Sequence, residues 1–183
     1  MEPASVQKIS KVLNILVTAA FICNLIALPL VPPMVYLRGN PFADVVMAGL
    51  DGNILHVWAQ GITHFWQDLY SLMLAGFLLF SGCCTAVILW QGRRVLRTIL
   101  RGEPFSMENA VSLRRAAVCS FLIAGAALAR VAFSLWFYRS PAPLATYNAL
   151  FVPIFAMFGL LCLVISALFR QAVELKAEND LTI

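Results

Sequence analysis

Charged residues are scarce in this sequence. Asp, Glu, Lys and Arg make up only 12% of its 183 residues, whereas 61% are apolar, and the mean hydropathy is +0.85. A soluble domain averages about 25% charged and 45–50% apolar residues. We therefore expect much of the chain to lie in a lipid bilayer.

Residues that bind metals or form disulfides are also few. The chain has two histidines and five cysteines, and it has no CxxC pair. All five cysteines fall inside apolar runs, at Cys23, Cys83, Cys84, Cys119 and Cys162. This placement predicts neither a disulfide framework nor a zinc site, and we expect no cofactor.

The sequence offers no obvious catalytic centre and no nucleic-acid surface. Acyl or phosphoryl transfer needs a clustered nucleophile, base or metal, and no such cluster is visible. The formal net charge is +4, but the basic residues stand at the ends of apolar runs and not on one soluble face, as nucleic-acid binding requires. We expect the chain not to be an enzyme and not to bind nucleic acid directly.

What the sequence does contain is four long apolar runs. About 20 apolar residues are needed to cross the hydrocarbon core, and the runs predict spans at 12–36, 69–90, 116–138 and 144–169. The expected fold is an all-α polytopic membrane protein with four transmembrane helices in a single domain, residues 1–183. Pro29, Pro32 and Pro33 should kink or end the first helix, and Pro153 should kink the fourth. The first run is longer than the roughly 7–15 apolar residues of a signal peptide, so we expect it to be kept.

The basic residues predict the orientation. Lys and Arg are enriched in short cytoplasmic flanks. With both termini cytoplasmic, only Arg38 and Arg139 lie outside, in an external loop 37–68 and between the last two spans. The cytoplasmic loop 91–115, the tail 170–183 and the N-terminal flank hold Lys8, Lys11, Arg93, Arg94, Arg97, Arg101, Arg114, Arg115, Arg170 and Lys176.

The second half of the external loop predicts a surface helix. At 100° per residue, Leu55, Trp58 and Ile62 share one face, while His56 and His64 lie on the opposite, polar face. An interfacial helix before the second span has this pattern. The two histidines, with Asp51 or Asp68, are candidates for metal binding or pH sensing. A wet polar face explains them equally well, because a spacing of eight residues is not a recognised ligand pattern.

The cytoplasmic loop predicts a helical hairpin. Arg93, Arg97 and Arg101 repeat every four residues, on a helix that continues from the second span. Gly102 and Pro104 should end it, and Ser106 should cap a new helix whose first turn holds Glu108. The arginines suit anionic lipid head groups or a docking surface for a cytoplasmic partner, and both interpretations stay open.

Arg130 is the charged residue within a predicted span. It lies eight residues before Tyr138, about 12 Å inside the membrane boundary, where a charge costs roughly 2.5 kcal/mol or more unless it is paired or snorkels. Candidate partners are Asp68, Tyr70, Asn24, Tyr147 and Asn148. A functional site and a snorkelling structural arginine are both consistent with this position.

Two segments together resemble a known family. They are residues 101–109 (RGEPFSMEN), followed by Leu113, Arg114 and Arg115, and the C-terminal residues 169–183. The chain resembles a bacterial family of four-span membrane proteins catalogued as domain of unknown function 2975. The resemblance implies a location in the bacterial cytoplasmic (inner) membrane and carries over no catalytic residue. Genes of this family often lie beside one for a small Cro/CI-type helix-turn-helix regulator, which implies that regulator as a candidate partner.

The C-terminal tail adds an argument from charge. Glu174, Glu178 and Asp180 would be repelled by an anionic leaflet, so we expect them to pair with the loop arginines or with a basic partner. We therefore expect a regulatory or scaffolding protein that binds a cytoplasmic partner such as a small DNA-binding regulator. The residues expected to bind partner or lipid are Arg93, Arg97, Arg101, Glu103, Pro104, Phe105, Glu108, Asn109, Arg114, Arg115, Glu174, Glu178 and Asp180.

The alternative function is transport or export of a small molecule. Broken helices with a buried charge occur at midplane binding sites, and Arg130, Asn24 and the proline-containing ends of the first and fourth spans would line such a path. Small residues along the spans permit close helix packing, but no exact GxxxG dimer motif is present. A homo-oligomer therefore remains an open expectation.

Overall fold

The computed structural model describes residues 3–36, 46–47, 49–65, 69–103 and 105–180, and their regular secondary structure is entirely helical. Four helical segments are long and apolar enough to cross a membrane: Gln7–Leu30, Leu69–Leu100, Met107–Tyr138 and Asn148–Asn179. The predicted fold class is thus confirmed, and the chain is a multi-pass membrane protein.

Prolines interrupt the first helix where the sequence predicts an interruption. Helix α1 (Pro3–Ala27) gives way to a 3-10 turn, η1 (Leu28–Leu30), and then to the short α2 (Val31–Tyr36). In an α-helix the carbonyl of Pro29 would accept the N–H of residue 33, but Pro33 has no N–H. The indole Nε1 of Trp58 donates to that carbonyl at 3.0 Å. Trp58 lies in α4 (Ile54–Phe65), so this bond fixes the predicted surface helix to the end of the first span.

The remaining helices run beyond the predicted spans. They are α5 (Leu69–Leu100), α6 (Met107–Tyr138) and α7 (Tyr147–Asp180), with a 3-10 turn, η2 (Ala142–Ala145), between the last two. At 1.5 Å per residue, 32 residues reach about 48 Å, more than the roughly 30 Å of hydrocarbon. Each of these helices therefore extends outside the membrane, and α7 continues unbroken through Pro153.

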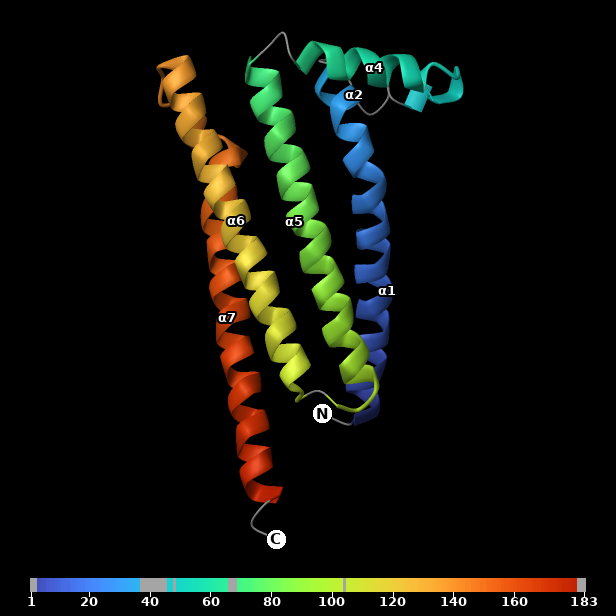
Figure 1. The fold of residues 1–183 in the computed structure, drawn as a ribbon, viewed down its shortest axis with the longest axis vertical. Coiled ribbons are helices and arrows are strands. Elements are labelled where there is room, and N and C mark those ends of the chain that lie inside the picture. Colours follow the sequence, from blue (N-terminus) through green and yellow to red (C-terminus); the bar gives the residue numbers. More distant parts are fainter. Residues whose placement is uncertain (1–2, 37–45, 48, 66–68, 104, 181–183) are drawn as a thin grey trace.

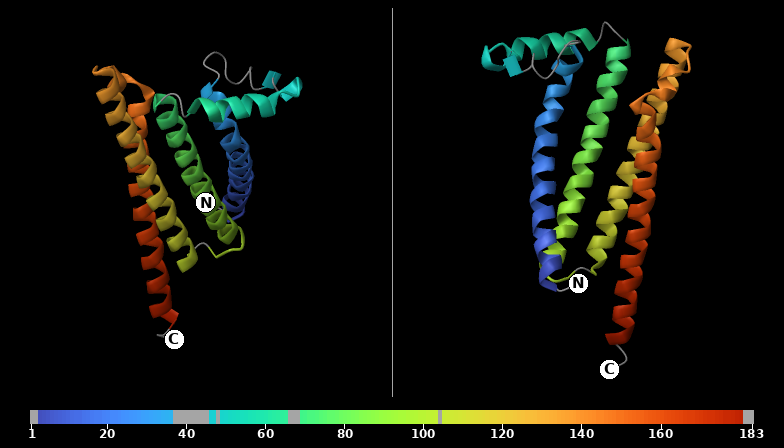
Figure 2. Two further views of the ribbon diagram at one scale, coloured as in Figure 1. Left: turned by 45° about the horizontal axis from the view of Figure 1, so that its top comes forward. Right: turned by 180° about the vertical axis from the view of Figure 1, so that it is seen from behind.

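The four long helices form a row in chain order (Figure 1). Helix α1 packs on α5, α5 on α6, and α6 most extensively on α7. The other views show the same order, with α1 and α7 on opposite flanks of the α5–α6 pair (Figure 2). Both termini lie at one end of the row, which we call the terminal face; α4 lies across the other end, the α4 end (Figure 1).

Helix α6 supplies most of the buried side chains, and most of these are small. The small ones are Ala110, Ser112, Ala116, Ala117, Ser120, Ala124, Ala127 and Ser134. Small residues let helices approach closely in lipid, where packing replaces the hydrophobic effect. Helix α1 differs, since Ile15 is 63% exposed and Leu16 is 60% exposed. The interior of the protein thus lies around α6, and α1 presents apolar side chains to the surrounding lipid.

Candidate functional site

The turn between α5 and α6 forms a capped hairpin, as the sequence predicts. Gly102 adopts a φ of 84°, which favours glycine, and α5 ends just before it. The Ser106 side chain accepts the backbone N–H of Asn109 at 3.3 Å and caps α6. Glu108 lies in the first turn, where the helix dipole favours an acidic group. Pro104 lies outside the described residues.

A surface ion pair joins the two arms of this hairpin. An Arg94 guanidinium nitrogen of α5 donates to Glu108 of α6. The two side chains are 38% and 54% exposed, so we expect the pair to contribute only about 0.2–1 kcal/mol. Its main consequence is that Glu108, a predicted partner-binding residue, already has a partner within the hairpin.

Asn109 forms the buried part of the same connection. Its side chain is 0% exposed, and its Oδ1 lies 2.7 Å from the Thr98 hydroxyl. That hydroxyl also lies 2.7 Å from the Val95 carbonyl, so its single proton is shared between two acceptors. Buried amides need hydrogen bonds, and Asn109 is therefore a structural residue of the hairpin.

Helix α7 is attached to the hairpin at two points. The rings of Phe105 and Phe169 meet edge to face with centroids 5.7 Å apart. One turn earlier in α7, the Ser166 hydroxyl donates to the Ala110 carbonyl at 2.7 Å. Phe105 and Phe169 belong to the two segments that carry the family resemblance. The structure brings these segments into contact, and it ties the C-terminal helix to the α5–α6 turn.

The other hairpin cations face outward, with one exception. Arg97, Arg101, Arg114 and Arg115 are exposed, as is the acidic Glu103. The exception is Arg93, which lies over the rings of Phe21 and Trp90 at 5.4 and 5.6 Å. Cation–π contacts of this kind suit a half-buried guanidinium. A shallow cavity of about 350 Å³ adjoins the hairpin, lined by Arg94, Met107, Glu108, Val111, Ser112 and Arg115.

The last eleven residues of α7 form a helical extension, residues 170–180. Arg170 Nε donates to Glu174 at 2.9 Å, one turn along the same helix. Glu174 therefore pairs within α7 and not with the hairpin arginines. Leu175 is 65% exposed and Glu178 is exposed, while the Asp180 side chain lies outside the described residues. The extension reaches past the ends of the neighbouring helices at the terminal face (Figure 1).

Arg130 contacts an aromatic ring. Its guanidinium carbon lies 4.9 Å from the ring centroid of Phe77 in α5, and Phe77 in turn meets Phe151 of α7 edge to face at 6.4 Å. Of the candidate partners, Asp68 lies outside the described residues, and Tyr70 packs on Phe137 and Tyr138. The ring of Phe77 lowers the cost of an arginine at this depth, which favours a structural account of the charge.

We expect Arg130 and Phe77 to be energetically coupled. A desolvated cation–π contact contributes about 1–2 kcal/mol, so Phe77→Leu should cost more in the wild-type chain than in an Arg130→Leu chain. A double-mutant cycle of reversible unfolding in detergent measures the difference. Arg130→Leu alone should keep the fold, because it also removes the cost of burying a charge. Strictly additive effects would contradict the coupling.

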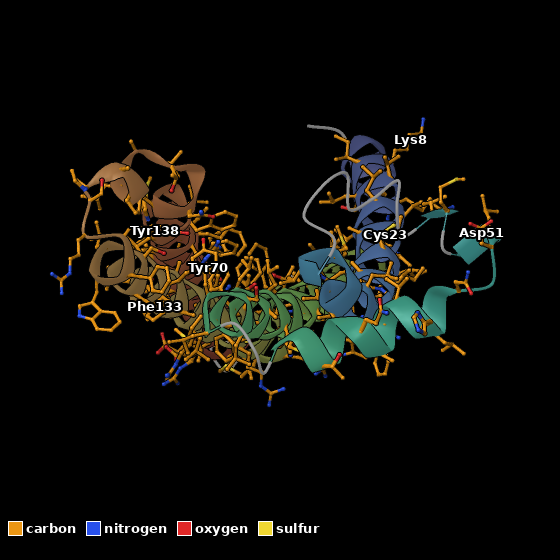
Figure 3. The ribbon with its side chains drawn as sticks, turned by 90° about the horizontal axis from the view of Figure 1, so that it is seen from above. Lys8, Cys23, Asp51, Tyr70, Phe133 and Tyr138 are labelled. Carbon is orange, nitrogen blue, oxygen red and sulfur yellow. The ribbon has the colours of Figure 1, made fainter. Side chains whose placement is uncertain are left out.

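The α4 end holds the predicted histidines. His56 is exposed on α4, whereas the His64 side chain and Asp68 lie outside the described residues. Within the described part of the chain no three His, Cys, Asp or Glu residues group in a way that holds a metal ion. Tyr70 and Tyr138 face each other near this end (Figure 3). A cavity of about 390 Å³ there is lined by Tyr70, Ser134, Tyr138, Ser140, Ala142, Pro143, Thr146 and Asn148.

Sequence reasoning missed the residues that connect the helices. Arg94 and Thr98 are one turn apart on α5, and both face residues of the first turn of α6. The capped turn at Gly102 and Ser106 indicated an antiparallel hairpin, so pairing residues at equal distances from the turn would have found Thr98 and Asn109. It would not have found Arg94 and Glu108, because Arg94 lies further from the turn than Glu108. Gln91, a buried glutamine of α5, was also overlooked. A lone glutamine directly after an apolar run carries no spacing signal.

Comparison with known proteins identifies a family but no characterised relative. Residues 29–183 match the profile of the family described as Protein of unknown function (DUF2975). No curated protein matches the chain, and no solved structure matches it. The match covers most of the sequence, including both segments that meet at the terminal face.

Proposed function

The chain belongs to the DUF2975 family of proteins of unknown function, and we propose that it is a non-enzymatic regulatory or scaffolding protein of a bacterial cytoplasmic (inner) membrane. In this proposal the terminal face is cytoplasmic. The α5–α6 hairpin and the extension of α7 form the surface that binds a cytoplasmic partner, such as a small helix-turn-helix regulator.

The distribution of basic residues supports this orientation. The flanks at the terminal face carry ten Lys and Arg residues, whereas Arg139 is the described basic residue at the α4 end. An excess of Lys and Arg in short flanks is typical of the cytoplasmic side. Exposed Arg97, Arg101, Arg114 and Arg115 also suit the anionic head groups of that leaflet, at about 1 kcal/mol for each residue near the surface.

One observation carries the proposal: the exposed extension of α7 continues directly from a part of the helix that contacts the hairpin. Phe169, the residue before the extension, packs on Phe105, and Ser166 donates to Ala110. A fixed helix with an exposed Leu175 and acidic neighbours presents a preformed docking element. Its acidic residues favour a basic partner, and DNA-binding regulators carry basic surfaces.

The transport alternative has less support. The long helices form a row in which α1 packs chiefly on α5, and Arg130 lies against the Phe77 ring. Broken helices of transporters place charges and helix ends at a shared binding site. The interruption at Pro29 instead receives the indole of Trp58, and α7 is continuous through Pro153.

We expect removal of the α7 extension to release the partner from the membrane. The test compares the full chain with one ending after Phe169, in native cells, by measuring the fraction of the candidate helix-turn-helix regulator that sediments with membranes. The membrane-bound fraction should fall about tenfold, which corresponds to ~1.4 kcal/mol of binding free energy. Co-purification of the two proteins from detergent measures the same interaction directly.

The controls separate docking from folding. The double variant Glu174→Lys and Glu178→Lys should reproduce the loss without shortening the chain, whereas Arg139→Glu at the α4 end should leave binding unchanged. Membrane levels and the melting temperature of each variant establish that the chain is folded. Equal distribution of the regulator with and without this protein would overturn the proposal.

A further inference from the structure

A groove lies among the four long helices, beside the hairpin cavity, with which it shares the lining residue Ser112. Its volume is about 370 Å³, within the roughly 300–1,000 Å³ range of small-molecule sites. Helices α5 and α6 form its floor, and α1 and α7 contribute one wall each. The lining residues are Leu13, Val17, Ile88, Gln91, Gly92, Val95, Leu96, Ser112, Leu113, Ala116, Phe158 and Cys162.

Gln91 is the unusual residue of this groove. Its side chain is more than nine-tenths buried, at 6% exposed, and its Oε1 atom is buried without a hydrogen-bond partner in the described part of the chain. Buried polar groups in native proteins nearly always have partners, and an exception calls for an explanation such as a bound molecule. Gln91 lines the groove, but Oε1 itself is covered by neighbouring atoms, so a donor held in the groove reaches it only when the Gln91 side chain rotates toward the groove.

We propose that this groove binds a neutral long-chain amphiphile from the bilayer, whose head-group hydroxyl donates to Gln91 Oε1. The apolar lining accommodates the chain, because it offers aliphatic and aromatic side chains from four helices. The head group is neutral, because no Asp, Glu, Lys or Arg is among the lining residues, and a charge buried in the groove without a partner is costly. The site goes beyond the proposed partner binding and does not depend on it.

The arrangement of the helices gives such a molecule access. Helix α1 packs chiefly on α5, and α7 packs on α6, with α1 and α7 on opposite flanks of the floor (Figure 3). A chain in the surrounding lipid therefore enters between α1 and α7 and does not have to cross a polar surface. Water alone and the side chain of a second copy are the competing occupants, and the test distinguishes all three.

The experiment uses two photoreactive probes that differ only in their donor. One is a long-chain alcohol with a diazirine in its chain, and the other is the methyl ether of that alcohol. The full chain is reconstituted in liposomes, irradiated with each probe and digested, and mass spectrometry quantifies labelling of peptides that contain Val17, Leu113 or Phe158. The alcohol should label these peptides about fivefold more than the ether, the factor expected for one hydrogen bond.

Variants assign that preference to Gln91. Gln91→Met keeps the length of the side chain and removes the acceptor, so the preference should fall to near one. Asn24→Leu is the matched control, because Asn24 also has a buried unpaired amide oxygen but does not line the groove. In this variant the alcohol should still label the groove peptides about fivefold more than the ether. In the wild type, excess unlabelled alcohol should suppress labelling and excess ether should not.

Three results would overturn the proposal. Equal labelling by the two probes in the wild type means that water satisfies Gln91. If the Gln91→Met variant is still labelled more by the alcohol than by the ether, the hydroxyl of the probe donates to a group other than Gln91. Protection of the groove peptides from both probes, together with chain-to-chain crosslinks from a photoreactive amino acid placed at Leu113, means that a second copy fills the groove.

Discussion

Replacing Gly159 by leucine is expected to lower the free energy of unfolding by about 2–3 kcal/mol, because overpacking at a close helix contact forces the backbones apart. A Cβ at Gly159 would lie 3.1 Å from Phe121 Cζ and 3.3 Å from the Ala117 carbonyl oxygen of α6. The phenylalanine ring can move, but the carbonyl belongs to the helix backbone. A leucine side chain extends further and must separate α6 from α7 at their most extensive contact.

Thermal or denaturant unfolding of the purified protein in detergent measures this loss, and Gly125→Leu is its matched control. Gly125 is exposed on α6, and a Cβ there meets no atom within 4 Å. The control should be neutral or slightly stabilising, since leucine favours helix over glycine by up to about 1 kcal/mol. Gly159→Ala should fall between the two. Equal stabilities of the two leucine variants would contradict the close packing of α6 on α7.

The helices and their main turns were predictable from the sequence because they follow from local properties. Four runs of about 20 apolar residues predict four spans, and Gly102 and Ser106 predict the turn and the cap that the structure shows. The lengths of the helices were less predictable. Hydropathy falls at Arg93 and beyond Phe169, but arginine, glutamate, lysine and alanine favour helix, so α5 and α7 continue where the apolar runs stop.

The contacts between helices were not predictable in the same way. Such contacts depend on how each helix is rotated about its axis and how deep it lies in the membrane. A run of apolar residues whose few polar residues do not share one face predicts neither the rotation nor the depth. Arg130 illustrates this, because its ring partner Phe77 is an ordinary apolar residue in the sequence. The unpaired amide oxygen of Gln91 and the order of the helices in the row also depend on how the helices pack, so the sequence did not predict them.

The contacts at the terminal face also give the motif at residues 101–109 a physical meaning. Gly102 turns the chain, Ser106 caps α6, Glu108 pairs with Arg94, and Phe105 packs on Phe169. These residues build the hairpin and attach α7 to it. In the proposed function the exposed arginines and the α7 extension bind the partner, so substitutions in the motif should act on binding through the position of α7.

Asn109→Leu is therefore expected to destabilise the protein by about 2 kcal/mol, the cost of losing a buried hydrogen-bonded amide and leaving its surroundings unsatisfied. Leucine has the same branched shape and is larger than asparagine, so none of the loss should come from a cavity. Amide hydrogen exchange should accelerate at the end of α5 and the first turn of α6. The effect should reach the partner as well, because a loosened hairpin no longer fixes Phe105 against Phe169.

A double-mutant cycle with Thr98→Val tests whether this loss arises from the contact between Thr98 and Asn109. The Thr98 hydroxyl lies 2.7 Å from Asn109 Oδ1, and valine keeps its shape without the donor. Each single variant breaks the contact, so the double variant should be about 1 kcal/mol more stable than the sum of the single effects predicts. Ser120→Ala is the control, because its hydroxyl bonds to Ala116 within α6 and its effect should add to that of Asn109→Leu. If the stability losses of Thr98→Val and Asn109→Leu are as additive as those of the control pair, other groups hold Asn109 in place. The arms of the hairpin would then be held together by the Arg94–Glu108 pair and the aromatic contact.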